Sequence, residues 1–86
     1  MRSHATRQYQ VLYEKLPADI QRQARQSYKL FRNNPHHPSL QFKRIHRLPG
    51  VWSVRVNDHY RALGRERNGE LYWFWIGTHN EYDKLV

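Results

Sequence analysis

Cysteine is absent from the 86 residues of the chain, so disulfide bonds and thiolate metal sites are excluded. A chain without cysteine fits a reducing compartment, and we expect a cytoplasmic protein. Apolar runs long enough to cross a bilayer are missing, and the first ten residues lack the apolar core of a signal peptide. We therefore expect neither a disulfide scaffold nor a partner membrane.

Acidic residues are scarce. The chain has 7 Asp and Glu against 15 Lys and Arg, which gives a net charge of +8. A domain this basic usually binds a polyanion, either nucleic acid or an acidic protein. The alternative is a basic surface that serves solubility alone.

Hydrophobic residues make up only 38% of the chain, but aromatic residues reach 14% and restore much of the area that can be buried. All three tryptophans (Trp52, Trp73 and Trp75) lie in strand-like runs. This pattern indicates a small folded core rather than disorder. We find no repeat or linker, so we predict a single domain over residues 1–86.

The last third of the chain predicts an antiparallel meander with strands near residues 51–57, 60–67 and 70–78. Asn68-Gly69 separates the last two runs, and this dipeptide is a strong signal for a tight hairpin turn. The segment from Leu71 to Ile76 is apolar at every position, which is typical of a strand with neighbours on both sides or buried on both faces.

Two helices are predicted before the meander, near residues 5–15 and 18–32. Each carries an apolar stripe at helical spacing, and Leu16-Pro17 separates them. Residues 41–47 predict a poorer first strand, because Ile45 breaks the alternation as at a bulge or an edge. The fold class is therefore α+β, with an N-terminal helical hairpin packed on one face of a four-stranded, mostly antiparallel sheet.

Strand alternation predicts which charges share a face. Val54 and Val56 point toward the helices, so Arg55 points to the opposite face, which we call the open face. Small residues around Ala62 suit helix packing, and this places Arg61 and Arg65 on the open face as well. In the last strand both alternating sets are apolar, so alternation does not decide the side on which His79 emerges.

If His79 emerges on the open face, Arg55, Arg61 and His79 converge on a groove floored by tryptophan. Arginine is a fixed phosphate donor, histidine titrates near neutral pH, and aromatic rings can stack on bases. Basic residues of the first strand would line the rim of this groove: Lys43, Arg44 and Arg47. The alternative is that both arginines pair with exposed carboxylates and that His79 is a turn residue.

Two other features favour structural readings. Four basic residues on one side of the second helix are typical of a solvated face: Arg22, Arg25, Lys29 and Arg32. The adjacent His36 and His37 stand between prolines with no third ligand at metal-site spacing, which indicates a rigid loop. We predict no metal and no cofactor.

The pattern as a whole resembles the RelE/ParE superfamily of toxins from bacterial type II toxin–antitoxin systems. The most specific segments are the YRAL strand at Tyr60–Leu63 and IGTHNEYDKL at Ile76–Leu85. Segments Asn34–Leu40 and Phe42–Leu48 extend the likeness over nearly the whole chain. The resemblance implies the α+β fold above, with a concave groove on its sheet.

The same resemblance implies candidate functions. Toxins of the RelE branch cleave mRNA in the ribosomal A site, whereas toxins of the ParE branch poison DNA gyrase. The catalytic positions of the nucleases match Arg55, Arg61, His79 and Tyr82. This sequence departs from many nucleases at Ser53, where they carry another basic residue, and Glu81 is the nearest candidate for an acidic residue that some relatives use.

The resemblance therefore implies an endoribonuclease that needs no metal. Its partners would be RNA, with the ribosome as a candidate place of cleavage, and an acidic antitoxin through which DNA is contacted only indirectly. We expect RNA-binding roles for Lys43, Arg44, Arg47 and Arg65. The alternatives are a gyrase inhibitor without nuclease activity and an inactive relative that only binds an antitoxin.

Overall fold

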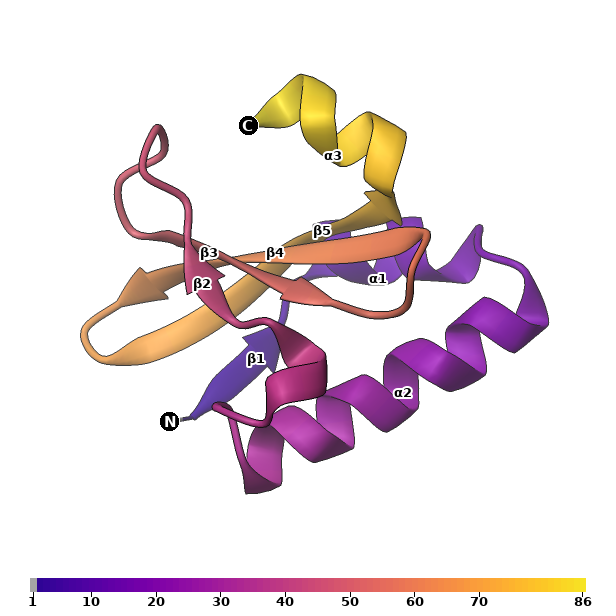
Figure 1. Ribbon diagram of the computed structural model, residues 1–86, viewed down its shortest axis with the longest axis horizontal. Coiled ribbons are helices and arrows are strands. Elements are labelled where there is room, and N and C mark those ends of the chain that lie inside the picture. The colour runs from indigo at the N-terminus through magenta and orange to yellow at the C-terminus, as the bar shows by residue number, and fades with distance from the viewer. Residues whose placement is uncertain (1) are drawn as a thin grey trace.

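The computed structural model describes residues 2–86, which form a five-stranded sheet with helices on both of its faces (Figure 1). The elements are β1 (Ser3–Ala5), α1 (Arg7–Glu14), α2 (Ala18–Asn33), the 3-10 turn η1 (Pro38–Leu40), β2 (Lys43–Arg44), β3 (Val51–Arg55), β4 (Tyr60–Arg67), β5 (Glu70–Thr78) and α3 (His79–Leu85). Within this described range, none of the helices is long and apolar enough to cross a membrane.

The strand order is β1-β5-β4-β3-β2, and all neighbouring pairs are antiparallel except β1 with β5. The predicted meander is confirmed. Its hairpin turn has φ of 52° at Asn68 and 79° at Gly69, as a type I′ turn requires. The apolar strand β5 has a neighbour on each side, in agreement with its composition.

Strand β1 was not predicted. The sequence predicts that the first helix begins near residue 5, but Ser3–Ala5 is extended and pairs with Leu71–Trp73 of β5. The helix begins only after Thr6, whose hydroxyl accepts the N–H of Tyr9. Three residues carry no detectable alternation, so this long-range pairing has no local signal.

The predicted strand over residues 41–47 is much shorter, since β2 consists of Lys43 and Arg44 alone. Gln41 has φ of 46°, a left-handed conformation that ends η1 and cannot continue a strand. Ile45 then turns into the second core described below. β2 is an edge strand, as the broken alternation indicated.

The main core lies between α1, α2 and one face of the sheet, and α2 runs below the sheet in Figure 1. Phe31 of α2 is almost fully buried and meets Trp73 edge to face, with ring centres 5.2 Å apart. Val54, Val56 and Ala62 belong to this core, so the predicted facing of β3 and β4 is confirmed.

A second core occupies the open face. Ile45, Val51, Leu63 and Tyr82 are buried together there, beneath α3. Ile45 packs on the opposite face from α1 and α2, so the face called open is partly covered. The helix α3 was also not predicted, although Thr78-x-x-Glu81 is the sequence signature of a capping box, which the structure contains.

A β-bulge in β5 explains why alternation could not resolve this strand. Leu63 pairs with Trp75 and Gly64 with Trp73, so Phe74 is the extra residue. Trp73 therefore packs in the main core, whereas Phe74 and Trp75 both pack against the second core. Trp73 and Trp75 therefore lie on opposite faces, although strict alternation would place them on the same face.

Candidate functional site

Arg55, Arg61 and His79 come together at one end of the open face, which we call the site end. Arg55 ends β3 and lies directly opposite Arg61 of β4, and Arg61 in turn lies opposite Gly77 of β5. His79 follows two residues after Gly77, as the first residue of α3. Three separate elements thus bring the predicted basic residues to one place.

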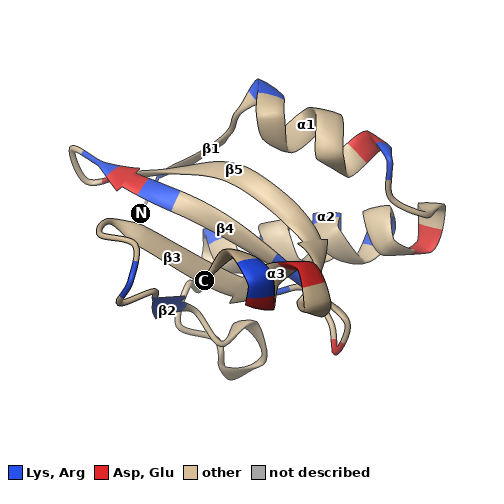
Figure 2. Cartoon of the chain, turned by 90° about the horizontal axis from the view of Figure 1, so that it is seen from above, with Lys and Arg blue, Asp and Glu red and all other residues tan. Residues whose placement is uncertain are grey.

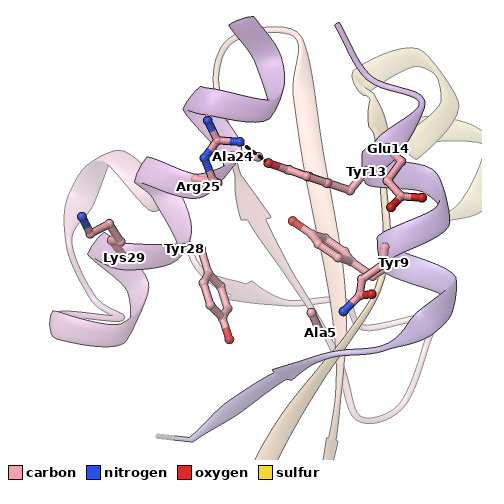
Figure 3. A pocket seen from close by; sticks show the side chains of 9 residues that line it. Ala5, Tyr9, Tyr13, Glu14, Ala24, Arg25, Tyr28 and Lys29 are labelled. Carbon is pink, nitrogen blue, oxygen red and sulfur yellow. Dashed lines mark hydrogen bonds between the residues drawn. The ribbon is translucent and has the colours of Figure 1, made fainter. Parts of the chain in front are cut away.

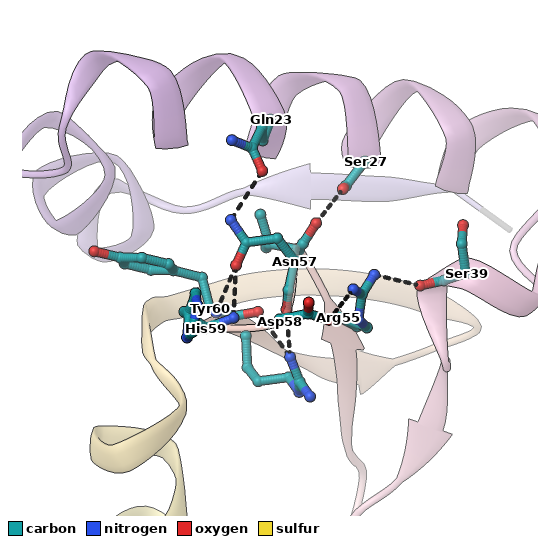
Figure 4. A network of polar contacts seen from close by, with 10 residues as sticks. Gln23, Ser27, Ser39, Arg55, Asn57, Asp58, His59 and Tyr60 are labelled. Atoms are coloured by element: carbon teal, nitrogen blue, oxygen red, sulfur yellow. Dashed lines mark hydrogen bonds and ion pairs between the residues drawn. The ribbon is translucent and has the colours of Figure 1, made fainter.

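Arg55 is held by two contacts at the site end (Figure 4). Its guanidinium donates to the Asp58 carboxylate at 2.5 Å and to the Ser39 carbonyl at 3.4 Å. The hydrogen bond from Arg55 is the main cause that lowers the pKa of Asp58, followed by the Arg55 charge, with smaller contributions from the charges of His59 and Arg61. The predicted alternative, an arginine paired with an exposed carboxylate, describes Arg55 in this structure.

Arg61 is half-buried and has no carboxylate partner among residues 2–86. Its guanidinium donates to the carbonyls of Asn57 and Tyr60 at 2.7 and 3.1 Å. Since like charges directly opposite each other on two strands are destabilising, Arg55 and Arg61 are not paired for stability. Two guanidinium groups on neighbouring strands can together bind an anion.

The β3–β4 loop holds these arginines rigidly. The side-chain oxygen of Asn57 accepts the backbone N–H groups of His59 and Tyr60 at 2.8 and 2.9 Å, and its amide donates to Gln23 of α2 (Figure 4). This is the Asx-turn geometry that favours asparagine at such a position. The loop is thereby tied to the helix below the sheet.

His79 is partly exposed, with 43% of its side chain accessible. Its Nδ1 lies 3.1 Å from the Asp83 carboxylate one turn along α3, and its backbone N–H donates to the carbonyl of His59 at 2.7 Å. The capping box between Thr78 and Glu81 fixes the start of α3. The hydrogen bonds from Thr78 also lower the pKa of the Glu81 carboxyl. His79 is therefore positioned by a helix start rather than by the end of a strand.

Tyr82 lies next to His79 but is a core residue. Its ring centre is 5.8 Å from that of His79, only 7% of the residue is exposed, and its hydroxyl points to the Ser53 hydroxyl at 3.5 Å. Ser53 itself is buried beneath it. A lysine or arginine at position 53 would have to displace Tyr82, which accounts for the small residue there.

The predicted rim residues lie on the edge strand β2 and in the loop that follows it. Lys43 pairs with Ser53 on the open face, whereas Arg44 pairs with Trp52 and its guanidinium lies 5.1 Å from that ring. A groove of about 600 Å³ separates this segment from α3, and its lining residues are Lys43, Arg44, Ile45, His46, Arg47, Tyr82 and Val86. Arg55, Arg61 and His79 do not line this groove, so it is not the predicted groove on which they converge. Trp52 and Trp73 pack in the main core, and of the three tryptophans only Trp75 packs against the second core on the open face.

Arg65 lies at the opposite end of the open face from the site end. Its guanidinium is 5.6 Å from the centre of the Phe74 ring, and the two line a groove with Arg67 and Tyr72. Four residues along one strand separate Arg65 from Arg61, which corresponds to about 14 Å. The sequence analysis did not single out Tyr72 and Phe74, because the bulge hid the side of the sheet on which they lie. Figure 2 shows charged residues at the end of β4 that lies away from the overlying α3.

One further pocket holds candidate binding groups. A pocket of about 470 Å³ between α1 and α2 is lined by tyrosines, and Arg25 donates to the hydroxyl of Tyr13 at 2.5 Å (Figure 3). Burial, with the nearby Tyr13 and Tyr28, raises the pKa of Tyr9 to about 12. Within residues 2–86, no cluster of three or more histidines and carboxylates is arranged to hold a metal.

Comparison with known proteins identifies the class. The sequence model of the ParE-like toxin domain matches residues 18–84, and the chain therefore belongs to the ParE-like toxin domain family. This confirms the resemblance to RelE/ParE toxins inferred from the sequence. A comparison with curated proteins gives no significant match.

Solved structures show the same fold at low sequence identity. The RelE toxin of a RelB–RelE antitoxin–toxin complex from Methanococcus jannaschii is 12% identical with a TM-score of 0.73, covering 95% of this chain and 98% of that chain. A YoeB/ParE toxin from Agrobacterium tumefaciens is 18% identical with a TM-score of 0.69, covering 92% and 99%. YafQ from E. coli is 12% identical with a TM-score of 0.72, covering 95% and 98%. The predicted RelE-like α+β fold is confirmed, with one strand more than expected.

Proposed function

We propose that the protein is a toxin that acts as a metal-independent endoribonuclease, cleaving mRNA and blocking translation. The observation that carries this proposal is the convergence of Arg55, Arg61 and His79 at the site end. Two fixed positive charges beside a titratable group are the parts that phosphodiester cleavage needs. The ribosome is the proposed place of cleavage, as in the RelE branch.

Arg61 and Arg55 would bind the phosphate and stabilise the charge that develops on its oxygens. Arg61 already points its guanidinium to the loop at the site end, and a phosphate would add to its two carbonyl contacts. Arg55 would exchange Asp58 for the phosphate. An exposed ion pair contributes roughly 0.2–1 kcal/mol, so this exchange is easy.

His79 would transfer a proton, since histidine is the side chain that does so near neutral pH. Tyr82 would act by positioning, because its buried ring packs beside His79 and supports α3 on the sheet. Lys43, Arg44, Arg47 and Arg65 would bind RNA on either side of α3. Arg65, about 14 Å from Arg61 along β4, would contact nucleotides that flank the cleaved bond.

The partner we propose is an acidic antitoxin in the cytoplasm, through which the toxin would contact DNA only indirectly. The net charge of +8 supports this partner, because opposite charge speeds and selects association. The antitoxin bound to the M. jannaschii relative supports it further.

A gyrase inhibitor is the second candidate, and it is favoured by the ParE-like description of the matching family. In that case the basic residues would bind a protein and no proton transfer would be needed. An inactive relative that only binds an antitoxin would need neither phosphate binding by the arginines nor proton transfer by His79.

Induced expression of single variants separates these functions. If the protein is a nuclease, His79→Ala and Arg61→Ala both relieve growth arrest, and wild-type induction stops protein synthesis first. If it inhibits gyrase, His79→Ala stays toxic and DNA replication stops first. Arg22→Ala, an exposed change on α2, serves as the matched control and should stay toxic. Full toxicity of both site variants would contradict a site at this end of the sheet.

A further inference from the structure

We propose that His59 is a second proton-transfer residue, which protonates the leaving 5′-oxygen while His79 takes the proton from the 2′-hydroxyl. This inference rests on the proposed nuclease function. It assigns a catalytic role to a loop residue and divides acid and base between two histidines.

The backbone brings the two histidines together. His59 lies in the β3–β4 loop, directly before β4, and its carbonyl accepts the N–H of His79 at 2.7 Å. Its own N–H is fixed by the Asn57 side chain at 2.8 Å (Figure 4). One backbone hydrogen bond therefore joins the two residues that carry the imidazoles. Arg61, which we propose binds the phosphate, lies two residues after His59.

The surroundings of the two rings suit different roles. Nδ1 of His79 lies against the Asp83 carboxylate at 3.1 Å. A neutral histidine that donates from Nδ1 to a carboxylate presents Nε2 as an acceptor, as a general base must. His79 is therefore the base of the pair.

His59 is exposed, and its charge is felt at the Asp58 carboxylate, where it contributes to the lowered pKa. The other charged groups around the loop are Arg55 and Arg61 on the strands and Asp83 and Glu81 on α3; α2 contributes the neutral Gln23. With His79 assigned as the base, the exposed ring of His59 is the group left for the acid step.

The reaction balances without a cofactor. His79 Nε2 takes the 2′-hydroxyl proton, and the 2′-oxygen forms a bond to phosphorus. The bond from phosphorus to the 5′-oxygen breaks, and the protonated His59 gives its proton to that oxygen. The products are a 2′,3′-cyclic phosphate and a 5′-hydroxyl, and the two histidines have exchanged protonation states.

The test is a pH–rate profile of the full chain on an oligoribonucleotide, free and bound to programmed ribosomes. The wild type should give a bell-shaped profile of kcat/KM. His59→Asn should lose the alkaline limb and about 10²–10⁴ of the rate, whereas His79→Asn should lose the acidic limb. Asparagine keeps the backbone hydrogen bonds, and circular dichroism should show an unchanged fold.

A second substrate isolates the acid step. When sulfur replaces the 5′-oxygen, the leaving group needs no proton, so His59→Asn should cleave it at nearly the wild-type rate while His79→Asn stays slow. His36→Asn, an exposed histidine of the loop before η1, is the control and should match the wild type on both substrates.

The outcomes separate the two claims. If the wild type cleaves RNA but His59→Asn keeps its alkaline limb and full rate, or is not rescued by the sulfur substrate, the role of His59 is refuted and the nuclease stands. If the wild type cleaves neither the oligoribonucleotide nor its sulfur analogue, whether free or bound to ribosomes, the nuclease proposal is refuted. The role of His59 is then refuted as well.

Discussion

Replacing Arg61 with alanine should lower the rate of RNA cleavage strongly while lowering the free energy of unfolding only slightly. The guanidinium makes two hydrogen bonds to backbone carbonyls, and each such bond contributes about 0.5–1.5 kcal/mol net. The Tyr60 carbonyl keeps other donors, since it also accepts the N–H of Val56. Relief of the repulsion from Arg55 offsets part of the loss, so we expect unfolding to become easier by about 1–2 kcal/mol.

The two hydrogen bonds of Arg61 thus make a modest contribution to stability. Domains are stable by roughly 5–15 kcal/mol, so the variant stays folded at 25 °C. Loss of one fixed donor to a developing negative charge typically lowers the rate by about 10²–10³. The loss of rate therefore cannot be ascribed to unfolding.

The assay compares single-turnover RNA cleavage with thermal unfolding of the same preparations. Arg61→Lys keeps the charge but lacks the planar fork, so its rate should lie between those of the wild type and Arg61→Ala. Arg22→Ala is the control for loss of one positive charge. Cleavage by Arg61→Ala within a few-fold of the wild type would refute the reasoning.

Three further changes test the structure. Thr78→Ala removes the N-cap of α3, so thermal unfolding should show a loss of about 0.5–2 kcal/mol of stability. The rate of RNA cleavage should fall as well, and Lys84→Ala on the same helix is the control for both assays. Gly64→Ala would place a Cβ 2.9 Å from Leu71 Cγ and 3.0 Å from Trp73 Cε3, so urea unfolding should show a loss of about 1–3 kcal/mol. Absorbance at high pH should show Tyr9 ionising near pH 12; because its pKa is higher in the folded state, the stabilisation is complete below the unfolded pKa, near 10, and is lost as pH rises toward 12.

The sequence was sufficient for the parts of the fold that have local signals. Asn68-Gly69 determines the hairpin turn, and hairpin pairing with alternation places Arg55 and Arg61 on the same face. These two predictions are sufficient to place the two arginines of the proposed site side by side. The family resemblance was confirmed on the same segments.

The remaining features depend on contacts between distant residues. Strand β1 forms because Ser3–Ala5 pairs with the edge of β5, and three residues are too few to show a pattern that predicts this pairing. The bulge at Phe74 reverses the facing of the residues on either side of it, and neither set of apolar side chains indicates where it falls. Tyr82 is buried because α3 packs on the sheet, and the capping box at Thr78 was the signal that could have predicted this helix.

His59 shows the same limit in the candidate site. Its place in the loop could be read from the sequence, but its hydrogen bond to His79 joins a hairpin to the start of a helix twenty residues later. Such a contact requires the register of β4 with β5 and the start of α3. Both follow from the fold and not from local composition.

The most direct measurement of the central claim is a map of RNA 5′-hydroxyl ends in cells shortly after induction. The account predicts new 5′-hydroxyl ends within translated messages for the wild type and for Arg22→Ala. These ends should be absent for Arg61→Ala and His79→Ala. An identical map in induced and uninduced cells, with growth arrested and gyrase–DNA complexes accumulating, would contradict the account.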